Sequence, residues 1–205
     1  MSILIIGGAG YIGSHTIKYF TQQNEDIIIV DNLLTGHKKS IHSDKFYQID
    51  IRDKEKLDKV FKENNIEAVI YFAANSRVGE SMEKSYEYYH NNVYGMMCIL
   101  DVMKQNNVDK IVLSSTTSIY GEPKNVPIIE SDETNPTNTY GETKLAMEKK
   151  MQWFDNAYGT KYVPLRYFNA TGTYFDGNIV ADHKTETYSI LQWKWILCKT
   201  TNRCS

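Results

Sequence analysis

Short apolar runs alternate with longer helix-forming stretches along most of the chain. The runs are rich in β-branched residues and predict strands over 2–6, 26–30, 45–49, 68–72, 110–114 and 161–166. The stretches between them predict helices up to about residue 22 and over 53–64, 85–106 and 138–158. This alternation predicts a doubly wound α/β fold, in which helices cover both faces of a parallel sheet.

Ligands of such sheets bind just beyond the carboxyl ends of the strands. Several residues that could contact a ligand fall at or just past the predicted strand ends. They are Gly7, Asp31, Asp50, Phe72, Thr116 and Tyr167. We therefore expect these residues to converge on one cleft.

A run of glycines joins the first predicted strand to the first predicted helix. Gly7, Gly10 and Gly13 allow a tight turn and a close approach of the backbone to a pyrophosphate. The N–H groups at the start of the helix would face the phosphates. The order of strand, glycines and helix predicts a Rossmann-type dinucleotide site. An ordinary glycine-rich turn is the alternative.

An acidic residue, Asp31, ends the second predicted strand. A carboxylate at this place can accept hydrogen bonds from an adenosine ribose diol, and it repels a 2′-phosphate. The sequence therefore favours NAD over NADP, although Lys38 and Lys39 follow closely and weaken the preference. A simple acid in a turn after a strand is the alternative.

Tyr140 and Lys144 stand at positions i and i+4 of a predicted helix, so their side chains share one face. Free tyrosine has a pKa of about 10, and a neighbouring cation favours the phenolate. The pair is therefore a candidate acid/base, downstream of the hydroxyl-rich strand end at 114–116. Taken alone, the pair also fits a solvated helix surface.

Composition narrows the class of protein. The 205 residues carry a net charge of −2, which gives no indication of a nucleic-acid partner. No apolar stretch is long enough to span a membrane, and no leader segment is recognisable. The three cysteines form neither a metal spacing nor a disulfide framework, so we expect no metal and a cytoplasmic location.

Several motifs occur in a characteristic order, namely GGAGYIG, DNLLTGH, FAAN, SSTTSIYGEP, YGETK and PLRYFNATG. With these motifs the chain resembles the extended short-chain dehydrogenase/reductases, and among them the UDP-sugar 4-epimerases. The resemblance covers about residues 2–185, which we expect to form an NAD-binding Rossmann domain with the catalytic residues. It implies bound NAD and reversible oxidation at C4 of a UDP-sugar, such as UDP-glucose or UDP-galactose, through a 4-keto intermediate.

The resemblance also implies roles for single residues. Tyr140 would be the catalytic base and acid, Thr116 its hydroxyl partner, and Lys144 the residue that holds the cofactor's ribose and lowers the Tyr140 pKa. The residues expected to contact NAD are Gly7, Gly10, Tyr11, Ile12, Gly13, Asp31, Asn32, Asp50, Ile51, Phe72, Asn91, Tyr140, Lys144 and Tyr167. The residues expected to contact the sugar nucleotide are Thr116, Tyr140 and Asn169.

Simpler roles remain open for some of these residues. The Thr116 hydroxyl could cap the chain after a strand, and Asn169 could form a turn. Asp50 could be a turn acid, Ile51 a core residue and Asn91 a helix-face amide.

The resemblance fades after Thr187, and residues 186–205 form a tail of different composition. We expect the smaller carboxyl-terminal substrate domain to be mostly absent and this chain to be weakly active or inactive, through either a frameshift near Thr187 or a genuine short form. A related nucleotide-sugar enzyme is one alternative, although a 4,6-dehydratase would carry Asp-Glu where Thr117 and Ser118 stand. A non-catalytic NAD-binding module is another, and the formation of a homodimer stays open.

Overall fold

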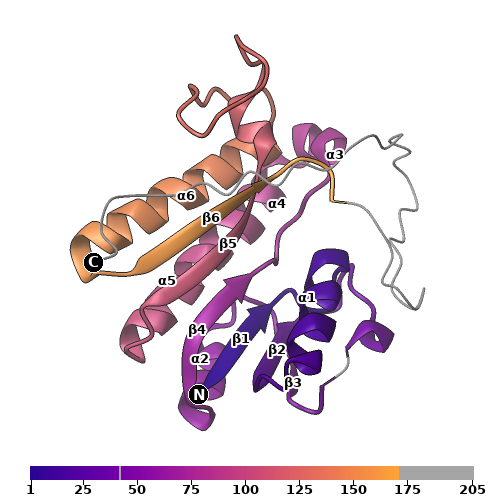
Figure 1. Ribbon diagram of the computed structural model, residues 1–205, viewed down its shortest axis with the longest axis vertical. Helices are drawn as coiled ribbons and strands as arrows, with labels where there is room; N and C mark the ends of the chain where they lie inside the picture. The colour runs from indigo at the N-terminus through magenta and orange to yellow at the C-terminus, as the bar shows by residue number, and fades with distance from the viewer. Residues whose placement is uncertain (42, 171–205) are drawn as a thin grey trace.

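The computed structural model describes residues 1–41 and 43–170, and the predicted tail at 186–205 lies outside them. Its centre is a parallel sheet of six strands in the order β3-β2-β1-β4-β5-β6 (Figure 1). The strands are β1 (Ser2–Ile6), β2 (Ile27–Asp31), β3 (Phe46–Gln48), β4 (Ile66–Tyr71), β5 (Lys110–Thr116) and β6 (Lys161–Tyr167).

Helices connect these strands. The α-helices are α1 (Tyr11–Gln22), α2 (Lys54–Glu63), α3 (Val78–Glu83), α4 (Ser85–Tyr88), α5 (Gly95–Gln105) and α6 (Thr139–Tyr158). Three short segments add to them, the 3₁₀ turns η1 (Lys38–Ser40) and η3 (Thr117–Tyr120) and the π-helical segment η2 (Tyr89–Tyr94). Among the described residues, no helix has both the length and the apolar character needed to cross a membrane.

Strands β1 and β4 are parallel neighbours at the middle of the sheet. The direction in which successive strands are added to the sheet reverses between these two strands. Chain connections run outward from this point to β3 on one side and to β6 on the other. The predicted doubly wound Rossmann-type sheet is therefore confirmed. A reversal of this kind opens a crevice at the carboxyl ends of the strands, where such folds bind nucleotides.

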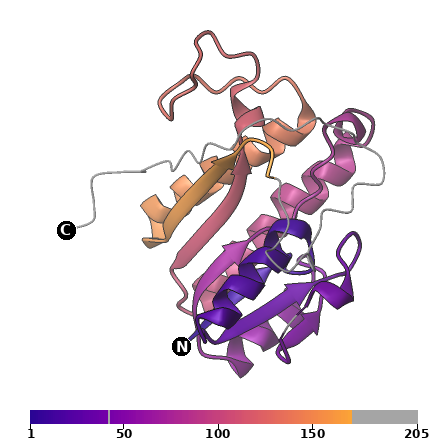
Figure 2. The same cartoon turned by 45° about the vertical axis from the view of Figure 1, so that its right-hand side comes forward.

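Two apolar clusters hold the layers together. On one face, side chains of α2, α5 and α6 pack on the sheet around Leu4, Val69 and Leu113. On the other face, Ile17 of α1 packs with Ile5 and Ile29. Figures 1 and 2 show α1 alone on its side of the sheet and the three other helices opposite it. Strands buried on both faces explain the nearly continuous apolar runs in the sequence.

Capping side chains mark two of the predicted helix starts. The Asp53 side chain accepts from Lys56 N before α2, and the Asn138 side chain accepts from Gly141 N before α6. The single helix predicted over 85–106 is instead α4, η2 and α5 in succession. Helix α3 was not predicted, because its six residues are too few to show a helical period.

Candidate cofactor and proton-transfer site

The glycine turn after β1 is shaped by steric demands on its backbone. Gly7 has a φ of +78°, and a Cβ atom there would lie 2.5 Å from Ala73 N. A Cβ atom at Gly13 would lie 2.4 Å from the carbonyl oxygen of Gly7. At Gly10, in contrast, a Cβ atom would meet only Gly7 O among the described atoms, at 3.4 Å. Gly7 and Gly13 therefore let the turn close, whereas Gly10 leaves space beside it.

That space lies at the start of α1. The helix begins at Tyr11, and its N-cap Gly10 provides no side-chain acceptor for the N–H groups of the first turn. Such N–H groups, together with the helix dipole, favour an anion at this position. The turn therefore fits a pyrophosphate group. Tyr11 packs edge-on against His15, with ring centres 4.8 Å apart, and Ile12 is partly buried.

Asp31 ties the glycine turn to the end of β2. One carboxylate oxygen accepts from Ala9 N at 2.9 Å, and the other accepts from Leu33 N at 2.7 Å. The residue is 9% exposed. Each oxygen keeps a further lone pair, so the carboxylate both shapes the turn and can still accept a hydrogen bond from a ligand.

Asp50 lies beside the β2 end and is paired with Arg52. The guanidinium donates to both carboxylate oxygens, at 2.7 and 2.5 Å, and this hydrogen bonding holds the pKa of Asp50 well below its usual range. Asn32 Nδ2 also donates to Asp50, at 3.2 Å. Ile51 is 5% exposed and packs against Gly95, so its side chain is part of the core.

Tyr140, the first residue of the candidate proton-transfer group, lies in the first turn of α6. Its backbone N–H donates to Ser81 Oγ at 3.1 Å, which fixes the start of α6 against α3. Burial raises the pKa of Tyr140, and a hydrogen bond with the Thr116 hydroxyl lowers it. The two hydroxyl groups that the sequence singled out are thus brought together. The Thr116 oxygen also accepts from Ser118 N at 3.2 Å.

Lys144 is 2% exposed and donates to the carbonyl oxygen of Ser114 at 2.6 Å. Burial lowers its pKa to about 7, against the opposing influence of the Glu148 charge. Its ammonium lies 6.0 Å from the centre of the Tyr140 ring. Burial disfavours the charged form of both groups, so it raises the pKa of Tyr140 and lowers that of Lys144. The expected lowering of the Tyr140 pKa by Lys144 stays a prediction.

The remaining predicted residues are spread around the same strand ends. Phe72 follows β4 directly and donates its N–H to Ile6 O at 2.8 Å. Tyr167 ends β6, and burial raises its pKa to about 12. Asn91 lies in η2 and donates to Asn92 Oδ1 at 3.1 Å. Asn169 is exposed, just past the end of β6.

Asn92 holds together two segments near the site, a role that the sequence did not indicate. It is fully buried, and its side chain bonds both backbone groups of Asn75, at 2.8 and 3.0 Å. It also donates to Thr143 Oγ1 at 3.0 Å. The contacts join the loop after β4 to α6. The only sequence signal is an amide within an apolar helix, and the π-helical turn that aims it is invisible in the sequence.

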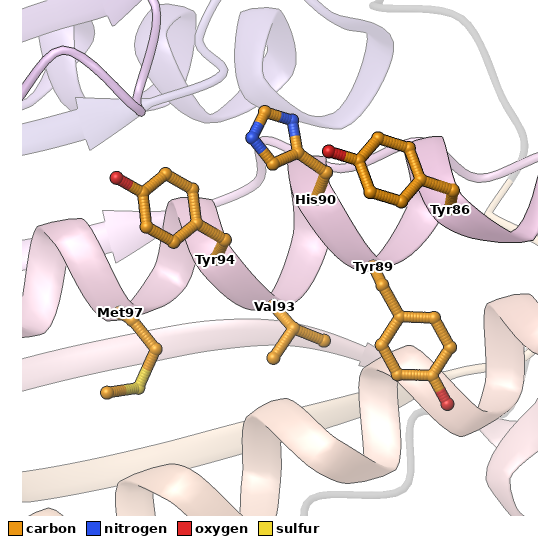
Figure 3. Close-up of a pocket in the computed structure, with 6 residues that line it drawn as sticks. All are labelled: Tyr86, Tyr89, His90, Val93, Tyr94 and Met97. Atoms are coloured by element: carbon orange, nitrogen blue, oxygen red, sulfur yellow. The ribbon is translucent and has the colours of Figure 1, made fainter.

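An aromatic hollow lies along α4, η2 and α5, on the same π-helical segment that carries Asn91 and Asn92. It has a volume of about 390 Å³ and is lined by Tyr86, Tyr89, His90, Val93, Tyr94 and Met97 (Figure 3). Figure 3 shows the rings of Tyr86, His90 and Tyr94 in a row along one side of the helix. The described residues hold no cluster of histidine, cysteine and acidic side chains that could bind a metal.

A family model described as "NAD dependent epimerase/dehydratase family" matches residues 3–191. The UDP-glucose 4-epimerase of Lacticaseibacillus casei is 51% identical over 191 residues, a match that covers 93% of this chain and 58% of the relative. The chain thus spans somewhat more than half the length of the curated relatives it matches.

Solved structures agree with this result. The UDP-glucose 4-epimerase of Brucella ovis, in complex with NAD, is 41% identical with a TM-score of 0.89, covering 91% of this chain and 57% of that one. The UDP-glucose 4-epimerase of Bifidobacterium longum, in complex with NAD+ and UDP, is 38% identical with a TM-score of 0.86, covering 90% of this chain and 58% of that one.

Proposed function

The chain belongs to the NAD dependent epimerase/dehydratase family, and from that premise we propose that it carries the cofactor-binding and proton-transfer groups of a UDP-sugar 4-epimerase. The observation that carries the proposal is the meeting of Thr116, Tyr140 and Lys144 at the carboxyl end of β5. Strands β1 and β5 both neighbour β4, so the glycine turn lies only two strand spacings, roughly 10 Å, from this group.

The proposed cofactor is NAD, held across the reversal point of the sheet. The space beside Gly10 takes the pyrophosphate, and Asp31 accepts from the adenosine ribose. The other proposed contacts are Gly7, Tyr11, Ile12, Gly13, Asn32, Asp50, Ile51, Phe72, Asn91, Tyr140, Lys144 and Tyr167. Since the side chain of Ile51 is in the core, its contact would be made by its backbone.

In the proposed reaction, Tyr140 reacts as the phenolate: it takes the proton from the 4-hydroxyl of the sugar while the hydride leaves C4, and it later returns that proton. When bound, NAD supplies the hydride acceptor and donor at C4. Thr116 steadies the phenolic oxygen by its hydrogen bond, and Lys144 holds the strand end through Ser114. Asn169, exposed beyond β6, is the proposed contact to the sugar nucleotide. Acid/base positioning of this kind contributes about 10²- to 10⁴-fold.

The proposal extends to domain organisation and assembly. Residues 1–185 would form the NAD-binding unit, and 186–205 a separate tail.

The exposed aromatic surface on α4, η2 and α5 supports a homodimer. Tyr86 is 75% exposed and Tyr94 is 48% exposed, and their rings lie along the same side of the helix. Contiguous aromatic surface of this kind commonly marks an interface. Light scattering of wild type against Tyr86→Ser tests it, and an unchanged monomer mass in both would rule it out.

The test of the main proposal has two arms. Calorimetry of the purified chain with NAD should give saturable binding, which Gly10→Leu abolishes because the side chain fills the pyrophosphate space. The control Gly79→Leu lies where no atom is within 4 Å of an added Cβ, so this variant should bind NAD normally.

The second arm tests turnover. The chain joined to the carboxyl-terminal region of the L. casei relative should convert UDP-glucose to UDP-galactose. Saturable NAD binding without turnover in that fusion would favour a non-catalytic NAD-binding module instead.

A further inference from the structure

Helix α6 bears a third ionisable residue on the face that carries Tyr140 and Lys144. Glu148 stands one turn beyond Lys144, as Lys144 stands one turn beyond Tyr140, and residues at this spacing lie in a row. Glu148 is 7% exposed. A carboxylate so deeply buried persists only where partners compensate its loss of hydration. Its partners therefore indicate what it does.

Those partners come from two neighbouring strands. Arg166 of β6 donates to both Glu148 oxygens, from Nη2 at 2.8 Å and from Nε at 3.2 Å. The Ser115 hydroxyl of β5 donates to one of the same oxygens. A two-pronged guanidinium contact fixes orientation as well as distance. The carboxylate thus joins β5, β6 and α6 at a single point.

This point adjoins the proposed site. Ser115 directly precedes Thr116, and Arg166 directly precedes Tyr167, and the two strands pair in register there. Helix α6 consequently holds three successive residues of β5: Lys144 bonds Ser114, Glu148 bonds Ser115, and Tyr140 bonds Thr116. A shift of the Glu148 contact would displace the hydroxyl that meets Tyr140.

Glu148 also bears on the charge of Lys144. Burial disfavours the Lys144 ammonium, and Glu148 is the charged group whose field opposes that effect. Other titratable or charged side chains on the elements that contact α6 include Glu80, Tyr88, Tyr89, Cys98, Asp101, Lys104, Tyr120, Arg166 and Tyr167. Of these, Arg166 pairs with Glu148 itself, and Glu80 pairs with Lys84 and accepts a hydrogen bond from Tyr88.

We propose that Glu148 is a positioning residue of this site: its carboxylate aligns the ends of β5 and β6 on α6 and supplies the counter-charge for the Lys144 ammonium. The inference rests on the proposed function only for the roles given to Thr116, Tyr140 and Lys144. It predicts that the charge of the side chain at 148 controls the protonation of Lys144. It also predicts that the length of this side chain controls the position of the strand ends. Glu148→Gln removes the charge, and Glu148→Asp keeps the charge but shortens the reach.

The experiment follows Lys144 by NMR in the full-length chain labelled with ¹³C-lysine, where the Lys144 signal is the one absent from Lys144→Arg. The wild-type midpoint should lie at about 7. In Glu148→Gln it should fall by roughly one pH unit or more, because the opposing charge is gone. Glu142→Gln removes the same charge from an exposed position on the same helix, so its midpoint should match wild type.

Glu148→Asp decides the positioning role, and it carries the whole test if Glu148→Gln does not fold. The Lys144 midpoint should stay near the wild-type value, whereas the backbone amide signals of Ser115, Thr116 and Tyr167 should shift. Each of three results would overturn the inference. The first is a Lys144 midpoint that falls by about one pH unit in Glu148→Asp, and the second is an unchanged Lys144 midpoint in folded Glu148→Gln. The third is strand-end amide signals that do not move in Glu148→Asp. No cofactor enters these measurements, so a chain that fails to bind NAD would refute the proposed function and leave this result standing.

Discussion

The Lys144 ammonium lies 6.0 Å from the centre of the Tyr140 ring and is bonded to the carbonyl oxygen of Ser114. The two side chains therefore share a helix face without a direct contact between charge and hydroxyl. The Tyr140 hydroxyl instead forms a hydrogen bond with Thr116. This hydrogen bond lowers the Tyr140 pKa, but the larger effect of burial raises it. The strand end at 114–116 is thus the common anchor of both residues.

Tyr140→Phe should remove the proton acceptor and little else. In the chain joined to the carboxyl-terminal region of the L. casei relative, turnover of UDP-glucose should fall by about 10² to 10⁴-fold. NAD affinity measured by calorimetry should stay within about a factor of ten, since a lost neutral hydrogen bond is worth less than roughly 1.5 kcal/mol. Tyr158→Phe, at an exposed position at the other end of α6, is the control. Near-normal turnover in Tyr140→Phe would remove Tyr140 from the mechanism.

Asp31→Ala should weaken NAD more than NADP, because the ribose acceptor and the repulsion of a 2′-phosphate disappear together. The structure adds a second cost, since Asp31 also holds Ala9 N and Leu33 N, and that cost should affect both cofactors equally. The ratio of the two dissociation constants is therefore the quantity to measure, by calorimetry. Asp44→Ala, in an exposed loop, should leave the ratio unchanged. Equal losses for both cofactors would show that Asp31 does not discriminate between them.

The sequence predicted the sheet because its strands are buried on both faces and its helices lie between them in regular order. The predicted helix starts at 53 and 138 agree with the capping residues of α2 and α6. Strand β3 is shorter than predicted, at Phe46–Gln48, although backbone hydrogen bonds to β2 continue at Lys45 and Ile49. The π-helical η2 was not predicted, since one inserted residue leaves the apolar pattern of a helix almost unchanged.

The candidate site was predictable at positions where the backbone geometry admits only one type of residue. Gly7 shows this, because its positive φ and close packing exclude side chains. Charges were less predictable, because a helical spacing tells which side chains share a face but not how deeply they are buried. The burial that raises the pKa of Tyr140 could therefore not be foreseen, and the expected lowering of this pKa by Lys144 stays a prediction. The contacts of Glu148 and Asn92 depend on how α6 packs on distant segments, which no local pattern encodes.

Gly7→Ala should destabilise the fold strongly. The added methyl group would lie 2.5 Å from Ala73 N, and the φ of +78° is strained for any residue with a Cβ atom. We expect a loss of at least about 2 kcal/mol in the free energy of unfolding, measured by urea denaturation. Gly79→Ala makes the same chemical change in α3, where no atom lies within 4 Å of the added group. It should leave stability unchanged or raise it by up to about 1 kcal/mol.

Lys144 should make the stability of the protein depend on pH in a defined window. Burial lowers its pKa from 10.5 to about 7, so between these values the unfolded chain binds a proton that the folded chain does not. Stability must then rise with pH across this window, by at most roughly 1.4 kcal/mol per unit, and this residue adds no slope below about pH 7. In urea unfolding, the stability of wild type relative to Lys144→Met should therefore increase from pH 7 to pH 9. Lys149→Met, an exposed change on the same helix, should give a flat difference. A flat difference for Lys144→Met as well would mean that the buried ammonium keeps its proton, and that Glu148 compensates the burial more fully than the structure indicates.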